Sequence, residues 1–462
     1  MQSFSWHLAG AVLSFGLQFV AARLLGASEY GWANYLLGYA LTISTFTYFG
    51  VQLYLPKELQ VSTDQNKTLS ATFWTNSLIY LAALPLIWLI LGRFVNAVES
   101  VYILTIAYLT LISEMMAAFY VGIGKAGAGA FIRRFLFSLF NILIFFGMLL
   151  SGWRSGSIYL LAVIAAHMLI NIPMFFRRLK FPEFRFAVLK RSLKFYLIQI
   201  VYGLYTGLSR VLQGIFGTIE SVAVLSVGLL LSNIAIMMGD NFAKVVMPYF
   251  SKAWAEADWN KIQEAYYEVT RFNAYLILPV VLFVMVNASK ILSLLGPEYA
   301  TGVLVLNLLL FSQFFSTLVG PNGTLLSMTD KERYEIFNGT VKLALALALG
   351  FLLGPRYSWG IAFSIAGSDV LVNILKTLEV KKLFGFWPHK PKVFLFLGIL
   401  TLIEIAGFLM LGKIANLVVF VLVNGLFGLL IYFLSFYFSP EAKDRATLLR
   451  AIRRFSSLLA KN

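Results

Sequence analysis

Long apolar stretches without charged residues recur along the whole chain and determine its predicted structure. Runs of 18 or more such residues predict transmembrane helices, because a helix needs about 20 residues to cross the hydrocarbon core of a bilayer. The segments between them are too short for a soluble domain, so the pattern predicts one all-α integral membrane protein with about fourteen transmembrane helices. The expected spans are residues 3–25, 33–55, 68–91, 100–122, 135–152, 157–176, 195–217, 221–243, 272–289, 300–327, 336–353, 357–378, 393–411 and 414–438.

Composition agrees with this prediction and narrows the chemistry. Of the 462 residues, 60% are hydrophobic and only 13% are charged, which is not typical of a soluble domain. There are no cysteines and three histidines, so disulfides are excluded and a metal centre is not expected. A G-x-G-x-x-G sequence begins at Gly122, but it lacks the β-strand and βαβ unit that a dinucleotide site needs, so we expect no cofactor.

The basic charge of the chain is explained by membrane topology. The net charge is +16, and 30 of the 37 Lys and Arg residues fall on one side of the fourteen-span arrangement. Cytoplasmic loops carry an excess of Lys and Arg, so both termini are expected in the cytoplasm of a multi-pass cell-membrane protein. A nucleic-acid partner is not needed to explain the charge. The opposite side has Arg23, Arg93, Arg154, Lys290, Arg356 and Lys413.

An internal repeat is predicted from two prolines. Pro56 and Pro248 each end an apolar run before a long cytoplasmic loop, and they are 192 residues apart. The same offset aligns His7 with Gln199, Ser14 with Thr206 and Gln18 with Arg210. The spacing within each segment places its residues on one face of a helix. Duplicated halves are common in transporters, with the substrate site at the repeat interface.

The repeat predicts two six-helix lobes in the same orientation, related by a pseudo-two-fold axis, plus two extra C-terminal helices. The expected divisions are an N-terminal lobe at 1–176, a basic cytoplasmic linker at 177–194, a C-terminal lobe at 195–385, helices 13 and 14 at 386–438, and a cytoplasmic amphipathic tail at 439–462. Residues 248–271 resemble the tail in pattern, and both are expected to lie at the membrane surface.

The expected span 195–217 carries a polar stripe that includes an arginine. Arginine stays protonated and its planar fork matches phosphate oxygens two at a time, so Arg210 is a candidate receptor for a phosphorylated substrate. The structural alternative is an ion pair with Glu114 or Asp240. Intramembrane charges are functional by default, which favours the first interpretation. The candidate substrate-binding residues are Arg210, Gln18, Gln199, Thr206, Gln213, His7, Ser14 and Arg23.

Acidic residues within the expected spans are candidate coupling-ion sites, because an intramembrane carboxylate needs a partner or a function. They are Glu114, Asp240, Asp369 and Glu404. The pattern does not single out one of the four. His7 and His167 are interpreted as hydrogen-bonded packing residues rather than proton relays.

Two sequence motifs carry a resemblance to a known family. "AARLLGASEYG" at 21–31 matches the motif A-R-x-L-G-x-x-x-[YF]-G, and "LLGPEYATG" at 294–302 matches L-x-G-x-x-Y-x-x-[AG]. In both motifs and across most of its length, the chain resembles the polysaccharide transport (Wzx-like) oligosaccharide flippases. These belong to the multidrug/oligosaccharidyl-lipid/polysaccharide (MOP) exporter superfamily.

The resemblance implies a flippase rather than an enzyme. Its cargo would be a polyprenyl-pyrophosphate-linked oligosaccharide, moved from the cytoplasmic to the outer leaflet by alternating access for cell-surface polysaccharide biosynthesis. The expected partners are this lipid-linked cargo and membrane lipid, with a polysaccharide polymerase or glycosyltransferases acting nearby, and the protein is expected to be a monomer. Arg210 would receive the pyrophosphate.

Three other functions remain open at this point. A related exporter of the superfamily could move lipid-linked peptidoglycan or teichoic precursors, or could be a drug or cation antiporter, for which an acidic cavity is expected. A membrane-embedded polysaccharide polymerase or ligase is disfavoured, because the external loops are short and a catalytic site needs room for converging acid and base groups.

Overall fold

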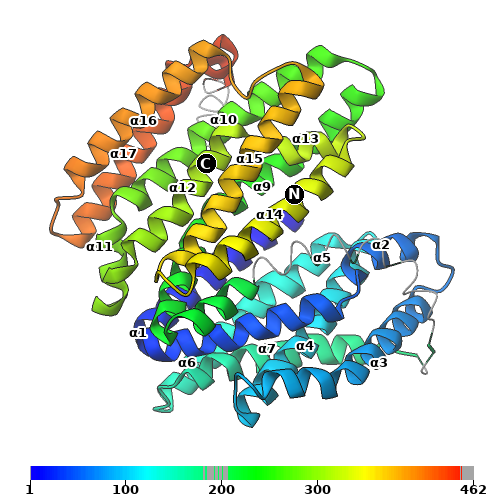
Figure 1. Cartoon of the computed structure of the whole chain (residues 1–462). Helices are drawn as coiled ribbons and strands as arrows, with labels where there is room; N and C mark the ends of the chain where they lie inside the picture. Colours follow the sequence, from blue (N-terminus) through cyan, green and yellow to red (C-terminus); the bar gives the residue numbers. More distant parts are fainter. Residues whose placement is uncertain are drawn as a thin grey trace, which may run out of the picture. The chain divides into compact units, whose positions relative to one another are not determined.

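The computed structural model of the chain describes residues 2–180, 183–184, 192, 196, 200, 207–447 and 449. Every regular element in these ranges is helical (Figure 1), which confirms the expected all-α class. The elements are α1 (Gln2–Thr47), α2 (Val51–Val61), α3 (Gln65–Leu91), α4 (Ala97–Gly122), α5 (Ala126–Ala130), the π-helix η1 (Phe131–Leu136), α6 (Phe137–Leu150), α7 (Gly156–Phe176), α9 (Ile219–Ala255), α10 (Trp259–Val286), α11 (Ala288–Ser293), the 3₁₀ helix η2 (Pro297–Gly302), α12 (Val303–Val319), α13 (Asn322–Met328), α14 (Glu332–Leu353), α15 (Gly360–Phe384), α16 (Pro391–Leu411) and α17 (Leu417–Tyr437).

Within the described part of the chain, 11 helices are long and apolar enough to cross a membrane. The protein is therefore a multi-pass membrane protein, as expected. Two expected spans, 3–25 and 33–55, share α1, which continues as a single kinked helix to Thr47. In the expected span 195–217, residues 195, 197–199 and 201–206 lie outside the described residues. The total of fourteen spans stays a prediction.

The chain folds into two compact units. Unit 1 contains 1–227 together with the short segments 295–299 and 351–361, and unit 2 contains 228–294, 300–350 and 362–462. These bounds differ from the expected lobes at 1–176 and 195–385, and the division into lobes stays a prediction.

Helix α1 of unit 1 is divided by a glycine. Gly26 has φ 76° and ψ 171°, a backbone conformation outside the helical region that a side chain would strain. Beyond the kink, Gly31 lies against the backbone of Ile219 at the start of α9, where a Cβ atom would have no space. Gly26 thus allows α1 to bend, and Gly31 allows the second part of α1 to pack closely against the start of α9.

Helix α4 is central to unit 1. It packs against α1, α2, α3, α5 and α7, and Leu111, Met115 and Phe119 lie in a buried apolar cluster. Asn96 and Glu99 form a capping box at its first turn, which satisfies two of the backbone N–H groups that a helix start leaves unpaired.

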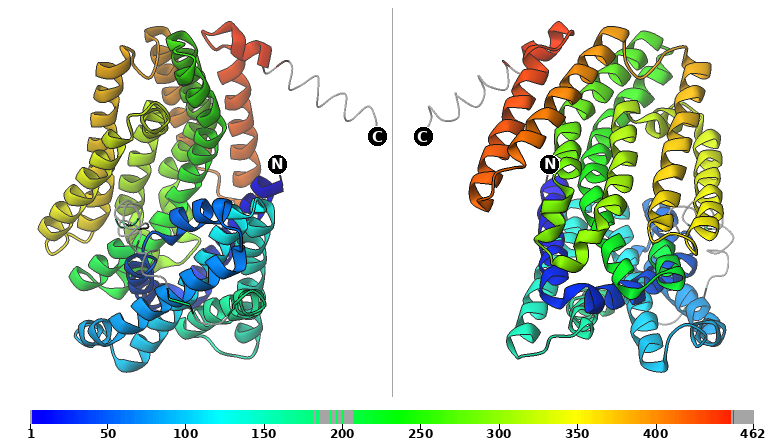
Figure 2. Two further views of the ribbon diagram at one scale, coloured as in Figure 1. Left: turned by 90° about the vertical axis from the view of Figure 1, so that its right-hand side faces the viewer. Right: turned by 60° about the vertical axis from the view of Figure 1, so that its left-hand side comes forward.

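Helix α10 has the same role in unit 2. It packs against α12, α16 and α17 (Figures 1 and 2). Two buried clusters lie along it. One surrounds Tyr266 and Phe250, and the other joins Tyr275 and Leu278 to Leu397 of α16.

The surface helix expected at 248–271 does not form as a separate element, while the expected position of this segment at the membrane surface stays a prediction. Helix α9 continues past Pro248 to Ala255, and α10 begins at Trp259 after a tight turn in which Ala257 has φ 52°. Asp258 caps α10 through the backbone N–H of Lys261, at 3.0 Å. The polar segment is thus the end of one long helix and the start of the next, because favourable capping and continuous helical periodicity extend both beyond their apolar parts.

The expected span 300–327 is broken into η2, α12 and α13. Gly320 has φ 72° and lies against the side chain of Thr270 on α10, so a Cβ atom would clash there. Pro321 follows and cannot donate a backbone hydrogen bond. These two residues end α12, and α13 is a separate short helix.

Candidate functional site

Arg210 lies in unit 1, in a helix at residues 207–216. Its Nε–H donates to the hydroxyl of Ser226 on α9, at 3.2 Å. The side chain is partly buried, and none of the carboxylates described by the structure forms an ion pair with it. In the described structure, Arg210 is therefore held by a neutral hydroxyl, and no described carboxylate compensates its charge.

Small residues bring the helix of Arg210 close to α1. A Cβ atom on Gly38 would lie 2.9 Å from Cβ of Arg210, and one on Gly207 would lie 2.7 Å from the hydroxyl of Thr42. Gly214 lies flat against the ring of Tyr35. Glycine permits such close approach of helices in a membrane. Because these glycines have no side chain, the helix that carries Arg210 can pack directly against α1.

Buried tyrosines surround this position within unit 1. Tyr30 on α1 is fully buried, and its hydroxyl has no hydrogen-bond partner among the described residues. Its ring lies 6.0 Å from that of Tyr159, and both side chains interact electrostatically with Arg210. Tyr299, also fully buried, donates its hydroxyl to the carbonyl of Ala22 at 3.1 Å.

These groups form a set of donors without an acceptor. A guanidinium carries five N–H donors, and in the described structure only the Nε–H of Arg210 has a partner. The unpaired hydroxyl of Tyr30 adds another donor nearby. Because buried donors are normally satisfied, the arrangement is suited to an anion with several oxygen acceptors.

Gln213 is buried one turn further along the same helix. Its Nε2 donates to the hydroxyl of Ser221 at 2.8 Å and to the carbonyl of Ser358 at 3.3 Å. These bonds fix the end of the Arg210 helix to the start of α9 and to the segment at 351–361. A role of Gln213 in binding substrate stays a prediction.

The other predicted binding residues are placed as follows. Gln18 donates to the hydroxyl of Ser14 at 3.2 Å, within the same face of α1. His7 and Arg23 are exposed on α1. Gln199 and Thr206 lie outside the described residues.

A cavity of about 490 Å³ opens beside the start of α9 in unit 1. Two carboxylates line it, and one of them, Glu29, accepts a 2.5 Å hydrogen bond from the backbone N–H of Gly156. This acidic lining does not suit a phosphate group. The lining residues are Ser28, Glu29, Trp32, Ser155, Ile219 and Glu220.

Glu114 is bound by Arg133 and not by Arg210, the partner that the structural alternative gave it. The two side chains form a largely buried ion pair between α4 and the π-helix η1. Arg133 and Arg134 lie between the expected spans 100–122 and 135–152, but in the structure they belong to a helical segment long and apolar enough to cross a membrane. A carboxylate in an apolar helix requires a cationic partner. The presence of Glu114 in an expected span was therefore the sequence feature that could have pointed to Arg133.

Arg134 is the second cation of this π-helix. It is exposed, and no carboxylate in the described part of the chain pairs with it. Its backbone lies against Gly10 of α1, where a Cβ atom would be 2.6 Å from its carbonyl oxygen. π-helical turns are frequent at functional sites, and here, among the described residues, Glu114 pairs with Arg133 only.

His167 forms the hydrogen bonds expected of a packing residue. Its Nδ1 lies 2.7 Å from the hydroxyl of Ser113, and the amide of Asn171 donates to the same hydroxyl at 2.7 Å. All three side chains are buried between α4 and α7.

The remaining candidate coupling residues lie in unit 2 and differ in environment. Asp369 is paired with Lys342, and Asp240 is exposed on α9. Glu404 on α16 is 1% exposed, and neither of its carboxylate oxygens has a partner in the described structure. The described residues include no cluster of three or more His, Asp or Glu side chains that could hold a metal ion.

Known structures share this fold. Lipid II flippase MurJ in an inward closed conformation matches with a TM-score of 0.70 and 14% identity, over 93% of this chain and 97% of that one. A multidrug resistance MATE family transporter of the MOP superfamily matches in its inward-facing conformation with a TM-score of 0.60 and 14% identity, over 83% of this chain and 95% of that one. Its outward-facing conformation matches with a TM-score of 0.52, 15% identity and the same coverage.

The helices described above therefore have the fold of MOP-superfamily membrane transporters. At sequence level, a profile for the family described as "Polysaccharide biosynthesis protein" matches residues 20–303, more than half of the chain. The chain belongs to this polysaccharide biosynthesis protein family. Among curated protein sequences, none matches it.

Proposed function

We propose that this protein is a flippase for a polyprenyl-pyrophosphate-linked oligosaccharide. It would move this cargo from the cytoplasmic to the outer leaflet of the cell membrane by alternating access, and so supply cell-surface polysaccharide biosynthesis. No catalytic role is included in the proposal. The observation that carries it is Arg210, a membrane-embedded cation with free donors and no carboxylate partner in the described structure.

The chemistry of Arg210 favours a phosphorylated cargo. Its fork can bind two phosphate oxygens at once, and the unpaired hydroxyl of Tyr30 offers a further donor. Arg134, which also lacks a carboxylate partner among the described residues, is a second candidate contact for the pyrophosphate. A membrane protein that exported organic cations would require the opposite charge at such positions.

A second candidate cargo follows from the same chemistry. A lipid-linked peptidoglycan or teichoic precursor also carries phosphate, and Arg210 would bind it equally well. The family assignment favours the oligosaccharide. Membership of the superfamily also allows a drug or cation antiporter, which the positive charges of Arg210 and Arg134 disfavour.

The topology of the proposal follows the charge of the loops. Most Lys and Arg residues fall on one expected side of the membrane, so we propose that both termini are cytoplasmic. The lipid-linked cargo and membrane lipid are the partners that this function needs. A polysaccharide polymerase or glycosyltransferases would act on the same cargo before and after it crosses.

Translocation of a labelled lipid-pyrophosphate oligosaccharide in proteoliposomes tests the role of Arg210. We expect Arg210→Ala to reduce the rate about tenfold or more, because a hydrogen bond to a charged group contributes about 1.5–3 kcal/mol and a factor of ten corresponds to about 1.4 kcal/mol. Arg210→Lys should retain part of the rate, because lysine keeps the charge without the bidentate geometry.

Arg93→Ala is the matched control, since Arg93 is an exposed arginine in the loop between α3 and α4. It should translocate cargo at the wild-type rate. Full activity of the Arg210→Ala variant, at equal amounts of folded protein, would exclude Arg210 as the receptor. Because Glu114 is bound to Arg133, a companion Glu114→Gln change should not restore activity, whereas restoration would support a structural ion pair instead.

A further inference from the structure

Glu404 lies in the middle of the buried face of α16. This face consists of Val393, Leu397, Leu400, Glu404 and Phe408, spaced three or four residues apart. Glu404 is 1% exposed, and both of its carboxylate oxygens lack a hydrogen-bond partner in the described structure. At 1.5 Å per residue it lies about 20 Å from the start of α16, well inside an apolar helix.

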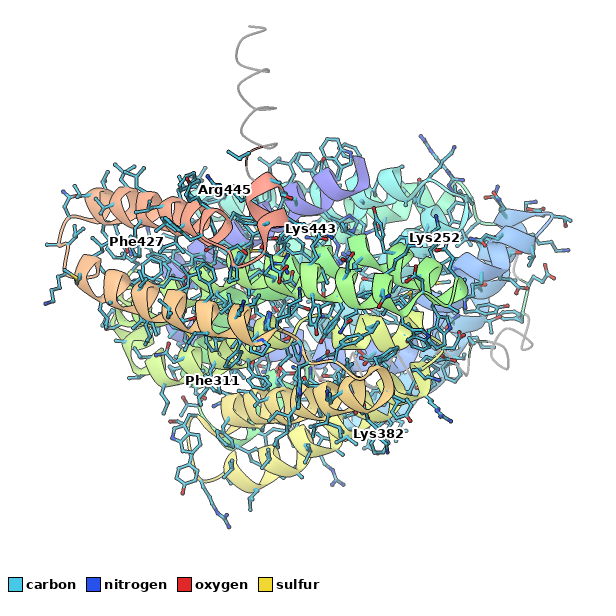
Figure 3. The ribbon with its side chains drawn as sticks, turned by 90° about the horizontal axis from the view of Figure 1, so that it is seen from above. Lys252, Phe311, Lys382, Phe427, Lys443 and Arg445 are labelled. Carbon is cyan, nitrogen blue, oxygen red and sulfur yellow. The ribbon has the colours of Figure 1, made fainter. Side chains whose placement is uncertain are left out.

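Aromatic side chains lie near Glu404 on both helices that pack against α16. Helix α16 packs against α10 and α17. Near this level, Phe427 of α17 contacts Phe408 at a ring distance of 5.1 Å, and Phe283 of α10 contacts it at 5.5 Å. Figure 3 labels Phe427 on this helix pair. The carboxylate is thus enclosed by aromatic and aliphatic side chains of unit 2.

Few charged or titratable groups are available to Glu404. The hydroxyl of Tyr432 on α17, which is close enough to Glu404 for an electrostatic interaction, already donates to the carbonyl of Leu276 on α10 at 3.1 Å. Arg271, the last charged residue of α10, is bound to Asp444. Helix α17 contains no charged residue, and the only other charged residue of α16 is Lys392, near its start.

A carboxyl group in this setting can hold a proton but not a metal ion. An ionised carboxylate without a partner is very unfavourable in an apolar interior, and such groups become neutral instead. A metal cation such as Ca²⁺ or Mg²⁺ needs six or more oxygen ligands. Glu404 supplies only two oxygens, and the nearby hydroxyl of Tyr432 is already used.

The other acidic residues in expected spans do not share this environment. Glu114 is paired with Arg133 and Asp369 with Lys342, while Asp240 is exposed. Two of those carboxylates are paired with a cation, and the third lies at the surface of the protein. Of the four carboxylates that the sequence offers, only Glu404 is both buried and unpaired in the described structure.

We propose that Glu404 is a proton-binding site of this transporter, and that its protonation is coupled to cargo transport. A proton from water on one side of the membrane would bind a carboxylate oxygen of Glu404. It would leave to water on the other side when α16 and α17 separate enough from α10 to hydrate the group. The coupling, but not the proton site itself, rests on the proposed flippase function.

Infrared spectroscopy of the purified protein in lipid bilayers tests the proton site directly. At neutral pH the wild-type protein should show the C=O stretch of a protonated carboxylic acid, and this band should be missing from Glu404→Gln. The glutamine is neutral and similar in shape, so it mimics the protonated form and should preserve folding. Glu441→Gln is the control, because Glu441 is paired with Lys390 at 2.8 Å and should leave the band unchanged. Identical spectra of wild type and Glu404→Gln would overturn the proposal.

Coupling is tested by translocation of the lipid-pyrophosphate oligosaccharide with and without an imposed proton gradient. The wild-type rate should change several-fold with the gradient, and the Glu404→Gln rate should not respond. An equal response of both proteins would overturn the coupling. If the wild-type protein moves no cargo under any gradient, the flippase function fails, while the infrared result still decides the proton site.

Discussion

A buried ion pair anchors the segment after α17 to α10 in unit 2. Arg271 binds Asp444 through two bonds, from Nε at 2.5 Å and from Nη2 at 2.6 Å. The exposed fractions of the two side chains are 6% and 0%. The hydroxyl of Ser439 also donates to Asp444 at 2.5 Å, and Tyr275 donates to Ser439 at 2.9 Å. The segment that leads to the C-terminal tail is thereby held at one position.

Removing one member of this pair should be strongly destabilising. Arg271→Ala leaves the carboxylate of Asp444 buried without its bidentate partner, and breaking a buried pair in this way costs about 3–5 kcal/mol. By contrast, Lys443 and Glu264 form an exposed pair at 3.2 Å with side-chain exposures of 72% and 69%. Its loss in Lys443→Ala should have an effect of at most about 1 kcal/mol. Figure 3 labels Lys443 on this segment.

Unfolding of the purified protein, followed by intrinsic fluorescence in a denaturant titration, measures both effects. The double change Arg271→Met with Asp444→Leu removes both charges, so it should recover most of the stability lost in Arg271→Ala, since apolar replacement of a buried pair is often neutral. Equal stability of Arg271→Ala and Lys443→Ala would refute the reasoning, because the burial and geometry of the two pairs would then have no energetic consequence.

Three further outcomes are expected. Gly31→Ala should lower the melting temperature, because the added Cβ meets the backbone of α9, whereas Gly16→Ala should not, since nothing lies within 4 Å of its Cβ. A thermal unfolding scan compares the two variants. Lys443→Cys should react with an impermeant maleimide only after the cells are opened, and Lys413→Cys should react in intact cells, if both termini are cytoplasmic. Burial lowers the pKa of His389 from 6.5 to about 4, so the neutral form is stabilised by folding. Its contribution should be complete above pH 6.5 and lost as the pH falls toward 4, and His389→Gln should reduce this part of the acid sensitivity in unfolding titrations.

Hydropathy predicted the helices where charge and turn residues bound an apolar run. The expected spans 393–411 and 414–438 match α16 and α17 to within a few residues. Prediction failed where helices continue through polar sequence. Helix α9 continues to Ala255, and helix α10 begins at Trp259, where the side chain of Asp258 caps its first turn. An apolar run also cannot reveal an internal break such as that at Gly320.

Sequence pattern identified the unusual charge at Arg210 but not its partners. Helical spacing predicts which residues share a face, and it placed Arg210 in a polar stripe. It could not tell that Glu114 binds Arg133, because ion pairing depends on contacts between helices that are distant in sequence. The role of the small residues Gly38 and Gly207 in placing Arg210 likewise required the structure.

The most direct test of the proposed function is the choice of cargo. Proteoliposomes that contain the wild-type protein would be loaded with a lipid-pyrophosphate oligosaccharide in one set and with an organic cation in another, and the protein-dependent transfer of each would be measured. We predict rapid transfer of the pyrophosphate-linked oligosaccharide, a rate lower by about tenfold or more in Arg210→Ala, and no transport of the cation. Transport of the cation without transfer of the oligosaccharide would contradict the assignment of Arg210 as a receptor for phosphate.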